Sequence, residues 1–209
     1  MSADRRKQIV EAAAKCFALM GYKATTMEHV AKIAGVGKGT IYTFFAQKEE
    51  LFDEIMRNFI QEMRGLAEQV LDDDKPLFDN MHPLLFELLD FRRQHELTIR
   101  LSHEVKEIGT PKAIEGMRQV ERAILEFVRR KVQDSLDKGE IKPCDPEITA
   151  FVILKLYVAF VHDWDKRGTL PLSNRNIAEL FQTYLVEGLG CEGCSCFFRS
   201  EMTDWAKWS

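Results

Sequence analysis

Short hydroxyl and cationic side chains gather in one stretch of the sequence, residues 25–45, which reads TTMEHVAKIAGVGKGTIYTFF. On a helical pattern its second half turns five residues away from the apolar side: Lys38, Gly39, Thr40, Tyr42 and Thr43. Groups of this kind donate hydrogen bonds to phosphate oxygens and are small enough to approach base edges. The stretch therefore predicts contacts with nucleic acid.

The elements that must position these groups are two short helices. Thr26 is placed to cap a helix over about Met27–Ala34, Gly35 allows a left-handed turn residue, and a second helix covers about Lys38–Phe45. Two short helices joined by a three-residue turn with a glycine are typical of a helix-turn-helix, whose second helix enters the major groove. A plain packing unit is the alternative interpretation.

The charge distribution agrees with a polyanionic partner. Residues 1–48 carry eight Lys/Arg and three Asp/Glu, whereas the other 161 residues carry 21 and 30, for a net charge of −4. A basic head on an acidic body favours DNA as the partner of the head. Short stretches of any sequence also differ by a few charges by chance, so a charge distribution without functional meaning is the alternative interpretation.

The rest of the chain follows the same helical periodicity, with no stretch that alternates long enough for a strand. We expect an all-α fold of about nine helices, in which a three-helix head (residues 1–47) precedes a larger body (residues 48–209). Pro83 should kink its helix or mark its start. The other expected helices cover about Asp4–Met20, Lys48–Leu71, Leu77–Gln94, Leu97–Ile108, Lys112–Lys138, Pro146–Lys166 and Asn174–Gly188.

Several classes of protein are excluded by composition and motifs. No apolar run reaches the roughly 18 residues of a membrane span, and no signal-peptide core follows the charged N-terminus. The sequence has no phosphate-binding Gly loop, no H-E-x-x-H and no nucleophile elbow. We therefore expect a cytoplasmic protein that is not an enzyme, with no catalytic residues, no cofactor, no metal site and no membrane partner.

Residues 5–52 resemble the N-terminal domain of the TetR/AcrR family of bacterial transcriptional repressors. The resemblance rests on Gly21-Tyr22, Thr25-Thr26, residues 33–36 (IAGV), residues 38–42 (KGTIY), Phe45 and residues 48–52 (KEELF). These are many positions in register over about a quarter of the chain. The remainder is similar to the family only in length and helical character.

The resemblance implies roles for individual residues. Thr26, Lys38, Thr40, Tyr42 and Lys48 match positions that touch phosphate or sugar, and Gly39 and Thr43 match positions that approach base edges. The resemblance also implies a double-stranded operator and a homodimer built from the last two helices.

Two positions depart from the family pattern. Gly37 stands where Ser or Thr often caps the second helix, so that helix start should be less well capped. Phe44 stands where His or Tyr is common, which removes a polar group that could contact phosphate.

Aromatic and methionine residues are abundant in the body and suit an adaptable cavity for a sizeable apolar effector, although each taken alone also fits a plain core. His103 and Glu104 are adjacent on one helix and cannot both face one cavity squarely. The candidate pocket residues are Phe59, Met63, Phe86, Arg100, His103, Met117, Phe127, Phe160 and Trp164.

The expected helix Pro146–Lys166 is too apolar for a surface helix and should be buried on two sides. With the last helix it would form a four-helix dimer interface across a two-fold axis, or else part of a large monomeric core. The candidate interface residues are Phe151, Leu154, Val158, Ile177, Phe181, Tyr184 and Leu185.

Three cysteines near the C-terminus, Cys191, Cys194 and Cys196, allow three interpretations: a metal ligand pair, a redox sensor, or a tail with no regulatory role. The function we expect is that of a repressor released from a palindromic operator by a hydrophobic small molecule. The alternatives are an all-helical binding protein or enzyme, and a repressor that senses metal or redox state through these cysteines.

Overall fold

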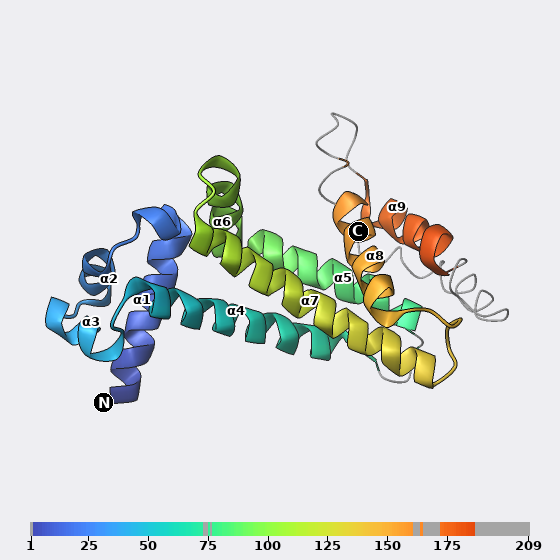
Figure 1. Cartoon of the computed structure of the whole chain (residues 1–209), viewed down its shortest axis with the longest axis horizontal. Coiled ribbons are helices and arrows are strands. Elements are labelled where there is room, and N and C mark those ends of the chain that lie inside the picture. Colours follow the sequence, from blue (N-terminus) through green and yellow to red (C-terminus); the bar gives the residue numbers. More distant parts are fainter. Residues whose placement is uncertain (1, 73–74, 76, 161–163, 165–171, 187–209) are drawn as a thin grey trace. The chain divides into compact units, whose positions relative to one another are not determined.

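The computed structural model describes residues 2–72, 75, 77–160, 164 and 172–186, and over these residues the fold is all-α with nine α-helices (Figure 1). The predicted fold class is confirmed, and most helix bounds agree within one or two residues. The cysteines at 191, 194 and 196 lie outside the described residues. None of the described helices combines the length and apolar character needed to cross a bilayer.

Helix α1 (Ser2–Ala24) contains a sharp break at Gly21, where φ is 80° and ψ is 175°. This positive φ is a conformation that glycine adopts without steric cost. Regular helix therefore ends after Met20, in agreement with the expected range Asp4–Met20, and the chain turns through Tyr22 and Lys23 toward α2.

Helices α2 (Met27–Ala34) and α3 (Lys38–Phe44) form the expected helix-turn-helix (Figure 1). The Thr26 hydroxyl caps α2 by accepting from the His29 N–H at 3.2 Å. Gly35 is left-handed (φ 63°), and its N–H reaches the carbonyls of the last turn. Gly37 begins α3 with no side-chain cap, as the sequence indicated.

Helix α4 (Lys48–Val70) joins α1 in an aromatic core. The Phe52 ring lies edge-on to those of Phe17 and Tyr22, with centroids 5.3 and 4.9 Å apart. Phe52 and Phe17 are fully buried. Aromatic pairs at these distances add to the stabilisation that burial alone provides, so this cluster anchors the first three helices on α4.

The remaining helices are α5 (Leu77–Gln94), α6 (Glu96–Glu107), α7 (Pro111–Asp137), α8 (Pro146–Val158) and α9 (Asn174–Phe181), followed by a π-helical turn over Gln182–Val186. Helix α5 begins at Leu77 and keeps Pro83 inside it, so Pro83 does not mark its start. Helices α8 and α9 are shorter than predicted in the part of the chain that the structure describes.

The chain divides into two compact units. Unit 1 comprises Met1–Glu68 and Leu88–Ala123, and unit 2 comprises Gln69–Glu87 and Ile124–Ser209. In unit 1, α1 packs against α2 and α6. The helix-turn-helix therefore shares a compact unit with α6 and with parts of α4, α5 and α7, while the predicted boundary after residue 47 stays a prediction.

Two helical glycines give a matched test of this packing. A methyl group at Gly116 in α7 would lie 2.9 and 3.0 Å from two atoms of the buried Phe52 ring, whereas a methyl at Gly65 in α4 meets nothing within 4 Å. We expect Gly65→Ala to stabilise the protein by about 0.5–1 kcal/mol, since alanine is the better helix former. Gly116→Ala should lose that gain to overpacking, which costs about 1–3 kcal/mol.

The measurement is the free energy of unfolding of both variants by urea titration. Because both changes are Gly→Ala inside a helix, the propensity gain cancels in the comparison. Equal stabilisation by the two substitutions would contradict the packing of Gly116 on Phe52.

Candidate nucleic-acid interface

The outward face of α3 carries the residues that the sequence singled out. Lys38, Gly39, Thr40, Tyr42 and Thr43 are all exposed, and Ile41 alone of this helix is fully buried. Tyr42 keeps 43% of its surface exposed. The structure thus gathers the five predicted residues of α3 on one helix of seven residues, with polar groups outward and Ile41 inward.

Several of these groups already have partners. The Thr43 hydroxyl donates to the Gly39 carbonyl at 3.1 Å, and the Thr26 hydroxyl serves as the α2 cap. A hydroxyl keeps further donor and acceptor capacity after one such bond. Both threonines therefore remain chemically able to bind a phosphate or a base edge.

Lys38 forms an exposed ion pair across the helix-turn-helix. Its Nζ lies 2.5 Å from a Glu28 carboxylate oxygen in the first turn of α2. The hydrogen bond raises the pKa of Lys38 and lowers the pKa of Glu28. The Lys38 ammonium, to which the sequence analysis assigned a phosphate contact, is thus already paired with the Glu28 carboxylate. The sequence analysis did not predict this pair.

Lys48, at the start of α4, binds the backbone between the break in α1 and the start of α2. Its Nζ donates to the carbonyl oxygens of Tyr22 at 2.9 Å and Thr25 at 3.0 Å, and lies 4.2 Å from the Tyr22 ring centroid. An ammonium has three donors. Two of the three hold the connection between α1 and α2, so Lys48 positions the helix-turn-helix in addition to its predicted phosphate role.

The Tyr22 side chain is held at its hydroxyl group. Its hydroxyl donates to the Glu49 carboxylate, and burial, followed by this bond, raises the pKa of Tyr22 far above its ordinary range. The same bond lowers the pKa of Glu49. Tyr22 therefore stays neutral at ordinary pH.

Helix α1 also holds the far end of α2. The Gln8 side chain donates to the Ala34 carbonyl at 2.8 Å, which satisfies a group at the helix C-terminus. Arg6 bonds the largely buried Glu54 carboxylate, and its guanidinium lies 5.0 Å from the Phe45 ring centroid. The two short helices are thus seated on α1 and α4 by polar contacts as well as by apolar packing.

Comparison with known proteins decides the family. The sequence model described as bacterial regulatory proteins, tetR family, matches residues 9–55. The chain is 51% identical over 189 residues to the uncharacterized HTH-type transcriptional regulator YhgD of Bacillus subtilis (strain 168), an alignment that covers 90% of this chain and 98% of that protein. The chain belongs to the TetR family of bacterial regulatory proteins.

More distant relatives are consistent with membership of this family. The HTH-type transcriptional repressor KstR2 of Mycolicibacterium smegmatis is 31% identical over 110 residues, which cover 51% of this chain and 53% of KstR2. A TetR transcriptional regulator of Chloroflexus aurantiacus has a similar fold, with a TM-score of 0.68 at 21% identity, covering 91% of this chain and 98% of that one. TetR-family regulators bind DNA and form dimers, and this chain is a transcriptional regulator of that family.

The residues predicted to line an effector pocket fall in both units of this TetR-family chain. Phe59 and Met63 are buried in unit 1, where Phe59 stacks on Phe91 with centroids 5.3 Å apart. His103 is exposed and lies 3.9 Å from Glu107. The predicted pocket residues Arg100 and Met117 also belong to unit 1, and Phe86, Phe127, Phe160 and Trp164 belong to unit 2.

Unit 1 contains a cavity of about 340 Å³ beside the end of α1. Of the predicted pocket residues, Arg100 lines it, together with Met20, Lys23, Ala24, Glu104, Glu107 and Ile108. Glu104, which the sequence analysis considered beside His103 but did not place among the nine candidates, is 5% exposed and bonded to backbone.

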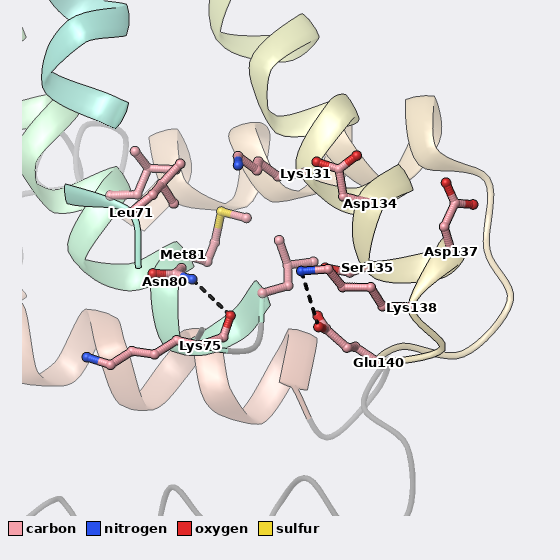
Figure 2. A pocket seen from close by; sticks show the side chains of 12 residues that line it. Leu71, Lys75, Asn80, Met81, Lys131, Asp134, Ser135, Asp137, Lys138 and Glu140 are labelled. Carbon is pink, nitrogen blue, oxygen red and sulfur yellow. Dashed lines mark hydrogen bonds and ion pairs between the residues drawn. The ribbon is translucent and has the colours of Figure 1, made fainter. Parts of the chain in front are cut away.

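Unit 2 contains a second cavity, of about 310 Å³, between α5 and the end of α7. Figure 2 shows its polar rim, where Asn80 donates to the Lys75 carbonyl and Lys138 pairs with Glu140. Met81 and Leu84 form part of its apolar lining. None of the nine predicted pocket residues lines this cavity.

Helix α8 presents an apolar outer face in unit 2. Ile148, Phe151 and Val152 are 64, 50 and 45% exposed, while Ile153 and Tyr157 on the inner face are buried. A single copy of the chain thus buries one face of α8, and burial of the second face against a partner stays a prediction. Among the predicted interface residues Phe151 and Tyr184 are exposed, Val158 is half-buried, and Leu154, Ile177, Phe181 and Leu185 are buried.

The Lys38–Glu28 pair predicts an electrostatic effect on DNA binding. Glu28→Gln removes the competitor for Lys38, so affinity for any duplex should rise, and the slope of log K against log salt should steepen by up to about one unit. The measurement is a salt titration of binding to a random-sequence duplex. Glu115→Gln, which breaks a 2.5 Å exposed pair with Arg122, is the control for the change in net charge.

Lys38→Ala in the Glu28→Gln background should abolish the gain. A slope that steepens equally in Glu115→Gln, or that survives the loss of Lys38, would show that Glu28 does not restrain this lysine.

Proposed function

We propose that this regulator is a repressor that binds a palindromic operator as a homodimer and leaves it when a hydrophobic small molecule binds. The observation that carries the proposal is the outward face of α3, where Lys38, Thr40, Tyr42 and Thr43 are exposed around a buried Ile41. A helix of this kind, held as the second of a helix-turn-helix, suits insertion into a major groove.

We assign each DNA contact from the hydrogen-bonding groups of the side chain and its position in the helix-turn-helix. Thr26, Lys38, Thr40, Tyr42 and Lys48 bind phosphate or sugar, because each offers a hydroxyl or ammonium donor. On the exposed face of α3, Gly39 allows close approach of the backbone to base edges, and the Thr43 hydroxyl and methyl read them.

The dimer forms through the outer face of α8 and the C-terminal helix. Ile148, Phe151, Val152 and Tyr184 are exposed large apolar residues, and Lys155 lies over the Phe151 ring at 5.4 Å. Ile148, Phe151 and Val152 recur at three- and four-residue spacing and so share one face. A second copy of the same face, related by a two-fold axis, would bury them.

The effector is a medium-to-large hydrophobic compound that binds among buried aromatic and methionine side chains such as Phe59 and Met63. To move the equilibrium from almost fully bound to almost fully released, it must prefer the released state by about 5.5 kcal/mol. Burial of roughly 200 Å² more apolar surface in that state supplies this, at about 25 cal/mol per Å².

Repression, rather than activation, is supported by the relative KstR2, whose name describes a repressor. Because a transcriptional regulator must reach DNA, we place the protein in the cytoplasm. It binds DNA and a small molecule without chemical conversion of either, so we assign it no catalytic residues and no cofactor.

Selection of duplexes from a random pool by the wild-type protein tests the function. We expect the selected sites to be palindromes with half-site centres about one helical turn (roughly 34–36 Å) apart, since a two-fold protein is mirrored in its site. Footprinting should protect both halves. An asymmetric single half-site, or the absence of any enriched sequence, would refute the proposal.

The interface is tested by Phe151→Glu, which places a charge in the centre of the proposed apolar contact. We expect sedimentation equilibrium to show a monomer where the wild type is a dimer, and the selected palindrome to be bound at least tenfold more weakly. The control is Leu19→Glu in α1, which is 68% exposed and outside this face. A dimeric Phe151→Glu protein would mean that the interface lies elsewhere.

A further inference from the structure

A buried carboxylate on α6 grips the backbone just after the break in α1. Glu104 is 5% exposed, and its two oxygens accept from the N–H groups of Tyr22 at 2.6 Å and Lys23 at 3.0 Å. Hydrogen bonds from amides to an ionised carboxylate are stronger than neutral ones. The contact joins residues 81 and 82 positions apart in the sequence.

The glycine at the break is matched to this carboxylate. A methyl group at Gly21 would lie 2.3 Å from Glu104 Oε2 and 3.4 Å from its Cδ. The positive φ of Gly21 turns the following amides toward α6, and its missing side chain leaves room for the carboxylate. The position of Glu104 thus explains both the positive φ of Gly21 and its lack of a side chain.

The connection that Glu104 grips leads directly to the cap of α2. Lys48 holds the carbonyls of Tyr22 and Thr25 from the other side, and the Thr25 hydroxyl closes the turn onto the Gly21 carbonyl at 2.7 Å. Thr26, the next residue, caps α2. The direction in which α2 and α3 leave α1 therefore depends on Glu104 and Lys48 together.

We propose that Glu104 is a positioning residue for DNA binding, through which α6 sets the pose of the helix-turn-helix. This rests on the proposed function and names the contact that regulates it. Because hydrogen bonds weaken steeply beyond about 3.5 Å, a shift of α6 by about 1 Å away from the connection breaks both bonds. The cavity of about 340 Å³ beside Glu104 gives the carboxylate room to withdraw.

Glu104→Gln tests the proposal, because glutamine has the same shape but replaces one acceptor with a donor that faces an N–H group. Glu107→Gln is the matched control: it lies on the same helix, lines the same cavity and changes the same charge, but its carboxylate is 68% exposed. The probe is a duplex that the wild-type protein has selected from a random pool, compared with a scrambled duplex.

For Glu104→Gln we expect at least a tenfold loss of affinity for the selected duplex, an unchanged active fraction in the titration and an unchanged salt slope. The slope should hold because no phosphate contact is removed. Amide hydrogen exchange at Tyr22 and Lys23 should quicken at least tenfold, while exchange at Met56 in α4 stays as in the wild type. Glu107→Gln should bind as the wild type does.

Binding within twofold of the wild type, together with faster exchange at Tyr22, would overturn the proposal and leave Glu104 a purely structural group. A lower active fraction at unchanged affinity would overturn it as well, because partial unfolding would explain the loss. If the wild type enriches no duplex, the proposed function itself fails, which is a different result.

Should Glu104→Gln lose its helical circular dichroism, Glu104→Asp takes its place, since it keeps the charge but withdraws it by one methylene group. Weakened binding with helicity intact is then the expected result. Wild-type binding by a folded Glu104→Asp protein, with Tyr22 and Lys23 exchanging faster, would overturn the proposal.

Discussion

The chain between the break in α1 and the start of α2 turns sharply, and two side chains of opposite charge bind its partly buried backbone groups. The Lys48 ammonium takes two carbonyls, and the Glu104 carboxylate takes two N–H groups, so that four backbone groups are satisfied by two side chains. Buried backbone groups without partners are costly. In our proposal the placement of α2 and α3, and with it the proposed DNA-binding face, depends on this arrangement.

Apolar packing provides the base on which these polar contacts act. Helix α1 packs against α4 through the rings of Phe17, Tyr22 and Phe52. The buried Ile41 side chain anchors α3 in the same unit. The side chains left outside are short, polar or cationic, and the Lys38–Glu28 pair keeps the charge of this face balanced in the free protein. The proposed groove-reading surface thus carries Lys38 as a member of an ion pair.

The local features of the helix-turn-helix could be predicted because each depends on one residue type in one conformation. Thr26 as a cap, Gly35 as a left-handed turn residue and Gly37 as an uncapped start all follow from neighbours in sequence. The partners of Lys48 and Glu104 could not be predicted, since they lie 23 to 82 positions away. The apolar character of both faces of α8 could be read from its composition, but which face packs within the chain could not, because the inner contacts come from elements distant in sequence.

Whether α3 reads the major groove is tested most directly by methylation interference on the selected duplex. Methylation by dimethyl sulfate marks guanine N7 in the major groove and adenine N3 in the minor groove. If two copies of α3 lie in successive major grooves, guanine methylation should block binding in two clusters one helical turn apart, and adenine methylation between them should be tolerated. Interference confined to minor-groove adenines, or to a single cluster, would contradict this mode of recognition.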